Sequence, residues 1–133
     1  RSGSKISNHF FGWDECKLWN ELVLVENTFN SIWLRDKLHC TTNFGSHLSR
    51  EQINKLIKSN VKSVVLLWDE GAHLRSESAI RALKKTGIPS ISIKIKGQPD
   101  DHSFEFLKAI IEKARVVLLQ NPEVNFINGT DNS

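Results

Sequence analysis

Cysteine is scarce in this sequence of 133 residues, in which Cys16 and Cys40 are the two thiols. They form no CxxC pair and have no metal-ligand spacing, and two cysteines make a poor disulfide framework. The five histidines are scattered, and none pairs with another at His-x-x-x-His spacing, which argues against a zinc site. No Gly-rich loop ends in Lys-Ser or Lys-Thr, which excludes a P-loop motor in this segment. A reduced, intracellular chain is the simplest interpretation.

Long apolar runs are also absent. No stretch approaches the roughly 18 consecutive apolar residues that a membrane span needs, and we see no signal peptide. We therefore expect a soluble protein that is not secreted and has no membrane partner. The length fits one domain, and contents of 39% hydrophobic and 25% charged residues are ordinary for a globular fold. The net charge of +3 is compatible with a polyanionic partner without demanding one.

Four short apolar runs predict β-strands, and helical patterns lie between them. The first and third runs are nearly continuous in Val and Leu, as in parallel strands that are covered on both faces. The fourth alternates more clearly, which places it nearer an edge of the sheet. The predicted strands are Glu21–Val25, Cys40–Asn43, Lys62–Trp68 and Ser90–Ile95.

The helical patterns carry their own start and stop signals. Ser49 and Gln52 form a capping box at the start of one helix, and "KKTGIP" ends the next with cations, Gly87 and then Pro89. Helices are expected at Asn27–Leu38, within Leu48–Ser59, along the stripe from Ala72 to Leu83, and near Ser103–Ala114. The alternation predicts an α/β fold: a Rossmann-like, mostly parallel four-stranded sheet with helices on both faces.

The two ends of the chain differ from its middle. Residues 1–7 begin with "RSGS", which has the look of a cloning remnant, and they are interpreted as such or as a flexible lead-in. Residues 8–118 form the predicted domain. Residues 119–133 end in a stretch rich in Asn, Gly, Thr and Ser, and we expect them to be a disordered tail or a linker.

Acidic residues follow three of the four predicted strands. Glu26 comes after the first, Asp69 and Glu70 after the third, and Asp100 and Asp101 shortly after the fourth. Ligands of open parallel sheets bind beyond the carboxyl ends of the strands. Carboxylates gathered there repel one another unless a cation is present, and Mg²⁺ prefers hard oxygen ligands. The alternative is that these acids only cap the helices that follow, where the helix dipole favours them.

These residues, in this order, resemble the Toprim domain, the metal-binding fold of primases, primase-helicases, topoisomerases and some nucleases. "LVLVENTFNSIWL" is similar to the first motif of the family, a strand that ends in Val-Glu-Gly. "FGSHLS" is similar to the middle motif, "VVLLWDEGA" to the Asp-x-Asp motif, and "IKIKGQPDDHS" to the acidic turn that follows in primases. The resemblance covers roughly residues 8 to 115 and is strongest to bacteriophage-type DNA primases and primase-helicases.

The resemblance implies a DNA primase-type nucleotidyltransferase that acts in DNA replication, in the cytoplasm or in a DNA-containing organelle. Its cofactor would be Mg²⁺ or Mn²⁺, and its partners would be DNA, nucleoside triphosphates and other domains of a larger replication protein. Glu26 and Asp69 are the implied catalytic residues. The implied metal ligands are Glu26, Asp69, Asp100 and Glu70, and the implied phosphate or nucleic-acid contacts are Ser46, His47, Lys96 and Arg75.

The sequence also departs from the family pattern, because one acid is missing from each acidic pair. Asn30, Gly71 and Gln98 stand where acids are usual, and Asn27 replaces the motif glycine. Three carboxylates can still hold one Mg²⁺, whereas two metals are harder to hold. Two other interpretations therefore stay open. One is a degenerate, non-catalytic Toprim module that binds nucleic acid or a protein partner, and the other is a Toprim nuclease.

Overall fold

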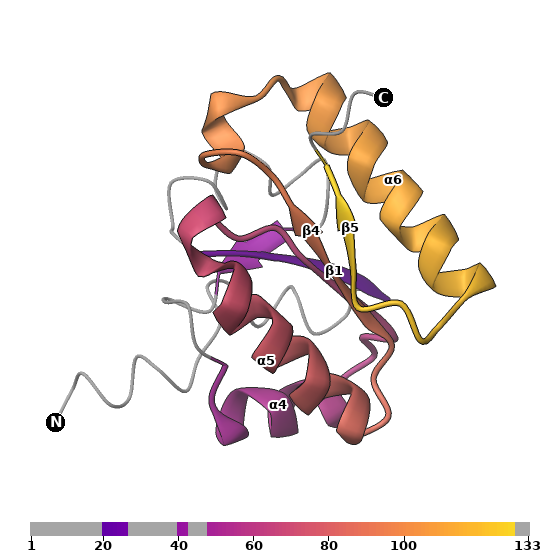
Figure 1. Cartoon of the computed structure of the whole chain (residues 1–133). Helices are drawn as coiled ribbons and strands as arrows, with labels where there is room; N and C mark the ends of the chain where they lie inside the picture. The colour runs from indigo at the N-terminus through magenta and orange to yellow at the C-terminus, as the bar shows by residue number, and fades with distance from the viewer. Residues whose placement is uncertain (1–19, 27–39, 43–47, 130–133) are drawn as a thin grey trace, which may run out of the picture.

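A computed structural model describes residues 20–26, 40–42 and 48–129, and these form an α/β fold around one sheet (Figure 1). The sheet has five strands, all parallel, in the order β2-β1-β3-β4-β5. The strands are β1 (Glu21–Val25), β2 (Cys40–Thr42), β3 (Ser63–Leu66), β4 (Ser90–Lys94) and β5 (Phe126–Asn128). The helices are α4 (Arg50–Ile57), α5 (His73–Lys85) and α6 (Phe104–Gln120), with 3₁₀ turns η1 (Glu70–Ala72) and η2 (Pro99–Asp101).

Each face of the sheet carries its own hydrophobic core. Leu24 and Leu66 pack on the face covered by α4 and α5, whereas Val23 and Val65 pack on the opposite face, under α6 (Figure 1). Successive side chains of a strand point to opposite faces, so a strand buried on both sides must be apolar at every position. This is why β1 and β3 appear in the sequence as unbroken Val and Leu, and the prediction of helices on both faces is confirmed.

The predicted signals at the helix ends are confirmed. The Ser49 amide donates to Gln52 Oε1 at 2.9 Å and the Gln52 amide donates to Ser49 Oγ at 3.1 Å, which completes the capping box. Helix α5 ends at Lys85, and Gly87 two residues further on has a φ of +91°, which is costly for residues that carry a side chain. There the amide of Ile88 donates to the carbonyl of Leu83, and the amide of Gly87 to that of Lys84, which is a Schellman motif.

Strand β4 lies between β3 and β5, so it is nearer an edge of the sheet than β3 but is not itself an edge strand. Its alternating serines are buried with the rest of the strand. Ser92 Oγ lies 2.9 Å from Ser76 Oγ of α5, and Ser90 Oγ donates to the carbonyl of Ile88 at 3.3 Å. A buried hydroxyl that has a partner costs little. The alternating serines therefore have polar partners inside the protein and are not exposed to water.

The sheet has one strand more than the four predicted. Helix α6 continues past the expected end at Ala114 to Gln120, and β5 then forms within the stretch that the sequence assigns to a tail or linker. Lys84 of α5 anchors the connection to β5. Its Nζ donates to the carbonyls of Pro122 and Val124 at 2.8 and 2.7 Å, and to Asn125 Oδ1 at 3.0 Å. Strand β5 thus depends on contacts with distant residues.

Several predictions lie outside the described residues. These are the helix at Asn27–Leu38, the contacts assigned to Ser46 and His47, and the lead-in at residues 1–7. Among the helices of the described segments, none combines the length and the apolar character needed to cross a membrane.

Candidate functional site

The order of the strands creates a crevice between β1 and β3. From β1 the chain crosses to β2 on one side, and from β2 it returns to β3 on the other side. Ligands of doubly wound α/β folds bind at such a switch point, beyond the carboxyl ends of the strands. Glu26 directly follows β1, and Asp69 lies shortly after β3. Glu26 and Asp69, the two residues predicted to be catalytic, therefore flank the switch point.

Glu26 and Asp69 are in direct contact across this crevice. The backbone amide of Asp69 donates to Glu26 Oε1 at 3.1 Å, which orients the Glu26 side chain. Both residues are half-buried. Asp69 Oδ1 is itself buried and makes no hydrogen bond with the described residues. A buried carboxylate oxygen without a partner is costly unless it is protonated or bound to a cation.

The environment of Asp69 disfavours its charged form. The pKa of Asp69 is raised from 3.8 to about 6, mainly by burial and then by the charge of Glu26 and a hydrogen bond with the Glu26 side chain. The more distant charges of Asp100 and Asp101 act in the same direction. Acids that follow β1 and β4 therefore raise the pKa of one carboxyl group that follows β3, as expected of carboxylates that gather at the carboxyl ends of neighbouring strands.

Glu70, a predicted metal ligand, is held by the neighbouring loop. Its amide donates to the carbonyl of Gly97 at 2.8 Å, and its Oε1 accepts a hydrogen bond from the Gly97 amide at 2.9 Å. This pair of bonds ties the segment after β3 to the segment after β4. Glu70 therefore has a structural role that the sequence did not reveal, and one of its carboxylate oxygens is already engaged.

The two acids of the turn after β4 differ in their roles. Asp101 Oδ2 accepts the amide of Gln98 at 2.9 Å and closes the turn η2. Asp100 is exposed on the same turn and affects Asp69 through its charge. Lys96 is exposed, and its carbonyl lies 2.8 Å from His102 Nε2, which fixes the start of the turn.

A hollow of about 360 Å³ lies beside Glu26 and Asp69. It is further lined by Glu70, Gly71, Ala72, Arg75, Gly97 and Gln98. Arg75, a predicted phosphate contact, therefore borders the acid pair, whereas Lys96 and Asp100 are not part of this lining. A Cβ atom built on Gly71 meets nothing within 4 Å, so a side chain would have room here.

The acid pair fits Mg²⁺ in its chemistry, although it offers few ligands. Mg²⁺ keeps several waters and is usually bound by one or two carboxylates together with substrate phosphates. Glu26 and Asp69 supply two hard-oxygen side chains, one of them with an orphaned buried oxygen. Within residues 20–26, 40–42 and 48–129, no group of three or more His, Cys, Asp or Glu side chains is arranged to hold a metal. The arrangement suits one hydrated Mg²⁺ better than a closed protein cage.

Sequence reasoning missed Gly97 and the turn-closing role of Asp101. Gly97 has a φ of +69°, and a side chain there would collide with Asp101 Oδ2. The signal was present, because a glycine shortly after a strand and two residues before a proline is typical of a tight turn.

Comparisons of the chain with protein-family models, with curated proteins and with solved structures gave no match.

Proposed function

We propose that this chain is the Toprim-type segment of a DNA primase-like protein, with a Mg²⁺-dependent site for nucleotidyl transfer in DNA replication. The observation that supports this most is the contact between Glu26 and Asp69 at the switch point of the sheet. A cation between their carboxylates would remove the repulsion that raises the pKa of Asp69. The motif order of the sequence adds the primase assignment to this geometry.

The residues of the crevice divide the work in the proposed reaction. Glu26 and Asp69 would hold Mg²⁺, which would stabilise the negative charge that develops on a phosphoryl group. Glu26, oriented by the Asp69 amide, would accept or donate a proton at the reacting oxygen. Arg75, at the border of the hollow, would neutralise phosphate charge with its fork of N–H donors.

Two further assignments are alternatives to the primase. Gly71 in place of the second acid, together with the lack of a three-ligand group in the described segments, favours a non-catalytic module that binds nucleic acid or a protein partner. A Toprim nuclease would use the same acids, because it also moves a phosphorus centre. Metal binding would separate the non-catalytic module from the primase and the nuclease. Primer-synthesis and nuclease assays of the whole protein would then separate the primase from the nuclease.

The test is titration calorimetry of the full chain with MgCl₂ and with MnCl₂. We expect saturable binding that is lost in Asp69→Ala and in Glu26→Ala. Glu112→Gln is the matched control, because Glu112 is an exposed acid of α6 outside the hollow. Binding that all three variants retain would place the metal elsewhere. No binding at millimolar metal would refute the proposal and leave the binding module.

A gain-of-function variant sharpens this test. Gly71→Asp restores the missing acid at a position with room for a side chain. We expect it to tighten Mg²⁺ binding by about tenfold, since each added ligand charge strengthens a hard-cation site. In the metal-free protein it should raise the pKa of Asp69 further through like-charge repulsion. Gly71→Asn keeps the size without the charge, and equal affinity in both variants would contradict the proposed site.

A further inference from the structure

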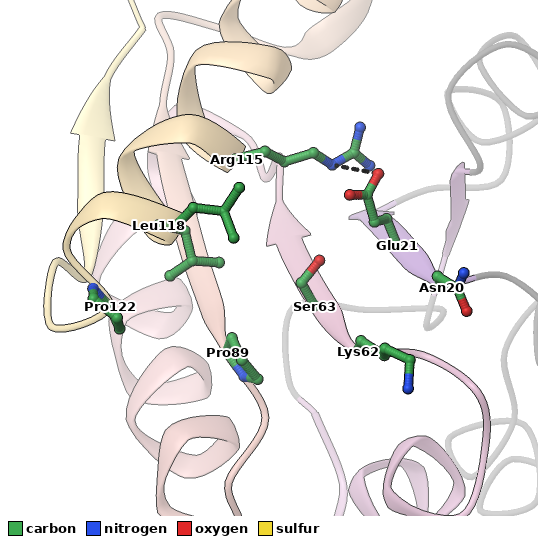
Figure 2. A pocket seen from close by; sticks show the side chains of 9 residues that line it. Asn20, Glu21, Lys62, Ser63, Pro89, Arg115, Leu118 and Pro122 are labelled. Carbon is green, nitrogen blue, oxygen red and sulfur yellow. Dashed lines mark ion pairs between the residues drawn. The ribbon is translucent and has the colours of Figure 1, made fainter.

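A second hollow lies at the other end of the strands, where β1 and β3 begin (Figure 2). Its volume is about 320 Å³, and Pro89, Leu118 and Pro122 form apolar walls around Ser63, the first residue of β3. This volume is at the lower end of the range of small-molecule pockets. Strand β1 separates this hollow from Glu26 by roughly 16 Å, at about 3.3 Å per residue. It is therefore a different site from the acidic crevice and does not depend on the proposed function.

Arg115 of α6 supplies the main charged group of this hollow. Its Nε lies 3.3 Å from Glu21 Oε1, an ion pair drawn in Figure 2, but the same Nε is buried and makes no hydrogen bond with the described residues. The Arg115 side chain is 19% exposed and that of Glu21 is 51% exposed. The guanidinium is thus held against the pocket, whereas the carboxylate can turn into water at little cost, because half-exposed ion pairs contribute little.

We propose that this hollow binds a small amphipathic carboxylate, an apolar chain or ring that ends in a carboxylate group. The apolar part lies against Leu118 and the two prolines, and the carboxylate replaces that of Glu21 on the guanidinium of Arg115. Arginine matches a carboxylate with two parallel N–H donors. The Ser63 hydroxyl borders the hollow as a further donor.

The charges and the apolar walls of the hollow together favour an amphipathic carboxylate. Arg115 and Lys62 are the two cations of the lining and Glu21 its one acid, so an anion is favoured over a cation once Glu21 turns away. The apolar walls disfavour a nucleic-acid backbone, which needs a cationic groove along its length. A neutral alcohol of the same length would contact the apolar walls but would offer no carboxylate to Arg115.

The experiment is an NMR titration of the full chain with hexanoate, octanoate and decanoate below their critical micelle concentrations, beside 1-octanol. We expect chemical-shift changes centred on Ser63 and Leu118. Affinity should rise about fourfold per methylene until the hollow is filled, since each buried methylene has a nearly constant transfer free energy. Octanoate should bind at least about tenfold more tightly than octanol, because hydrogen bonds to charged groups are the strong ones.

Two variants and two controls decide the outcome. Arg115→Gln should weaken octanoate about tenfold and leave octanol unchanged, whereas Lys108→Gln, an exposed cation of the same helix, should change neither. Ser63→Phe should fill the hollow and abolish binding of both ligands, at a strand position where an aromatic side chain is well tolerated. Circular dichroism checks that both variants are folded.

Three results would overturn the proposal. The first is the absence of shifts around Ser63, and the second is equal affinity for octanoate and octanol. The third is a dimer that is lost in Leu119→Asn and kept in Leu74→Asn, which would assign the surface to a second copy of the chain. These two leucines are matched, since they are 83% and 81% exposed and only Leu119 lines the hollow.

Discussion

The raised pKa of Asp69 predicts how the stability of the metal-free protein depends on pH. In the folded chain the pKa is about 6, against 3.8 for the unperturbed group. Between these values the folded state binds more protons at this site than the unfolded state. The contribution of Asp69 to stability is therefore fully present below pH 3.8 and is lost as the pH rises through 6. Asp69→Asn removes this dependence.

The magnitude follows from the two pKa values. Their difference of about 2 corresponds to about 3 kcal/mol at full strength. Asp69 is only half-buried, so screening by water reduces this to about 1–2 kcal/mol. In EDTA, the free energy of unfolding of Asp69→Asn minus that of the wild type should thus increase by about 1–2 kcal/mol between pH 4 and pH 7.

Urea denaturation followed by circular dichroism at several pH values measures this difference. Glu112, the exposed acid of α6, serves again as the control. The difference in free energy of unfolding between Glu112→Gln and the wild type should not change between pH 4 and pH 7. Addition of Mg²⁺ at pH 7 should stabilise the wild type and not Asp69→Asn, since a ligand that binds the folded state alone stabilises it by mass action. A flat difference for Asp69→Asn, or one that falls as the pH rises, would refute the reasoning about the acid pair.

Three other substitutions test the fold. Gly97→Ala should lower the free energy of unfolding by about 1–3 kcal/mol, because Gly97 has a positive φ and a side chain there would collide with Asp101. Gly71→Ala should leave this free energy nearly unchanged. Equal effects of the two substitutions in urea denaturation would contradict the assigned turn. Ser49→Ala should cost about 1 kcal/mol of unfolding free energy by removing the capping box of α4, and an unchanged urea midpoint would argue against that cap. Leu107→Ala should cost about 2–5 kcal/mol, because Leu107 is fully buried under the sheet; a loss below 1 kcal/mol, measured in the same way, would mean that α6 is not packed as described.

Much of the fold could be predicted because its signals are local. The strand Glu21–Val25 is apolar at four consecutive positions, the capping box is two side chains three residues apart, and the stop at Gly87 needs only the residues around it. Interactions within a few residues are determined by the types and spacing of those residues. The same holds for the acids at the strand ends, since parallel strands place their carboxyl ends at one edge.

The rest depended on residues far apart in the chain. Strand β5 has weak local signals and forms because β4 offers it a partner and Lys84 holds its connection. The position of β4 as the second strand from the edge follows from that pairing, because β5 takes the edge position. The ladder hydrogen bonds of a strand are all made to neighbouring strands, and no local pattern shows which neighbour is present.

For the candidate site, the sequence by itself determined which residue types stand at the strand ends, namely Glu26 after the first strand and Asp69 after the third. Only the tertiary structure decided that the Asp69 amide binds the Glu26 carboxylate, that Glu70 is held by Gly97, and that the pKa of Asp69 lies near 6. The physical reason is that charge repulsion and burial depend on distances between atoms, and those distances are set by how the strands pack side by side.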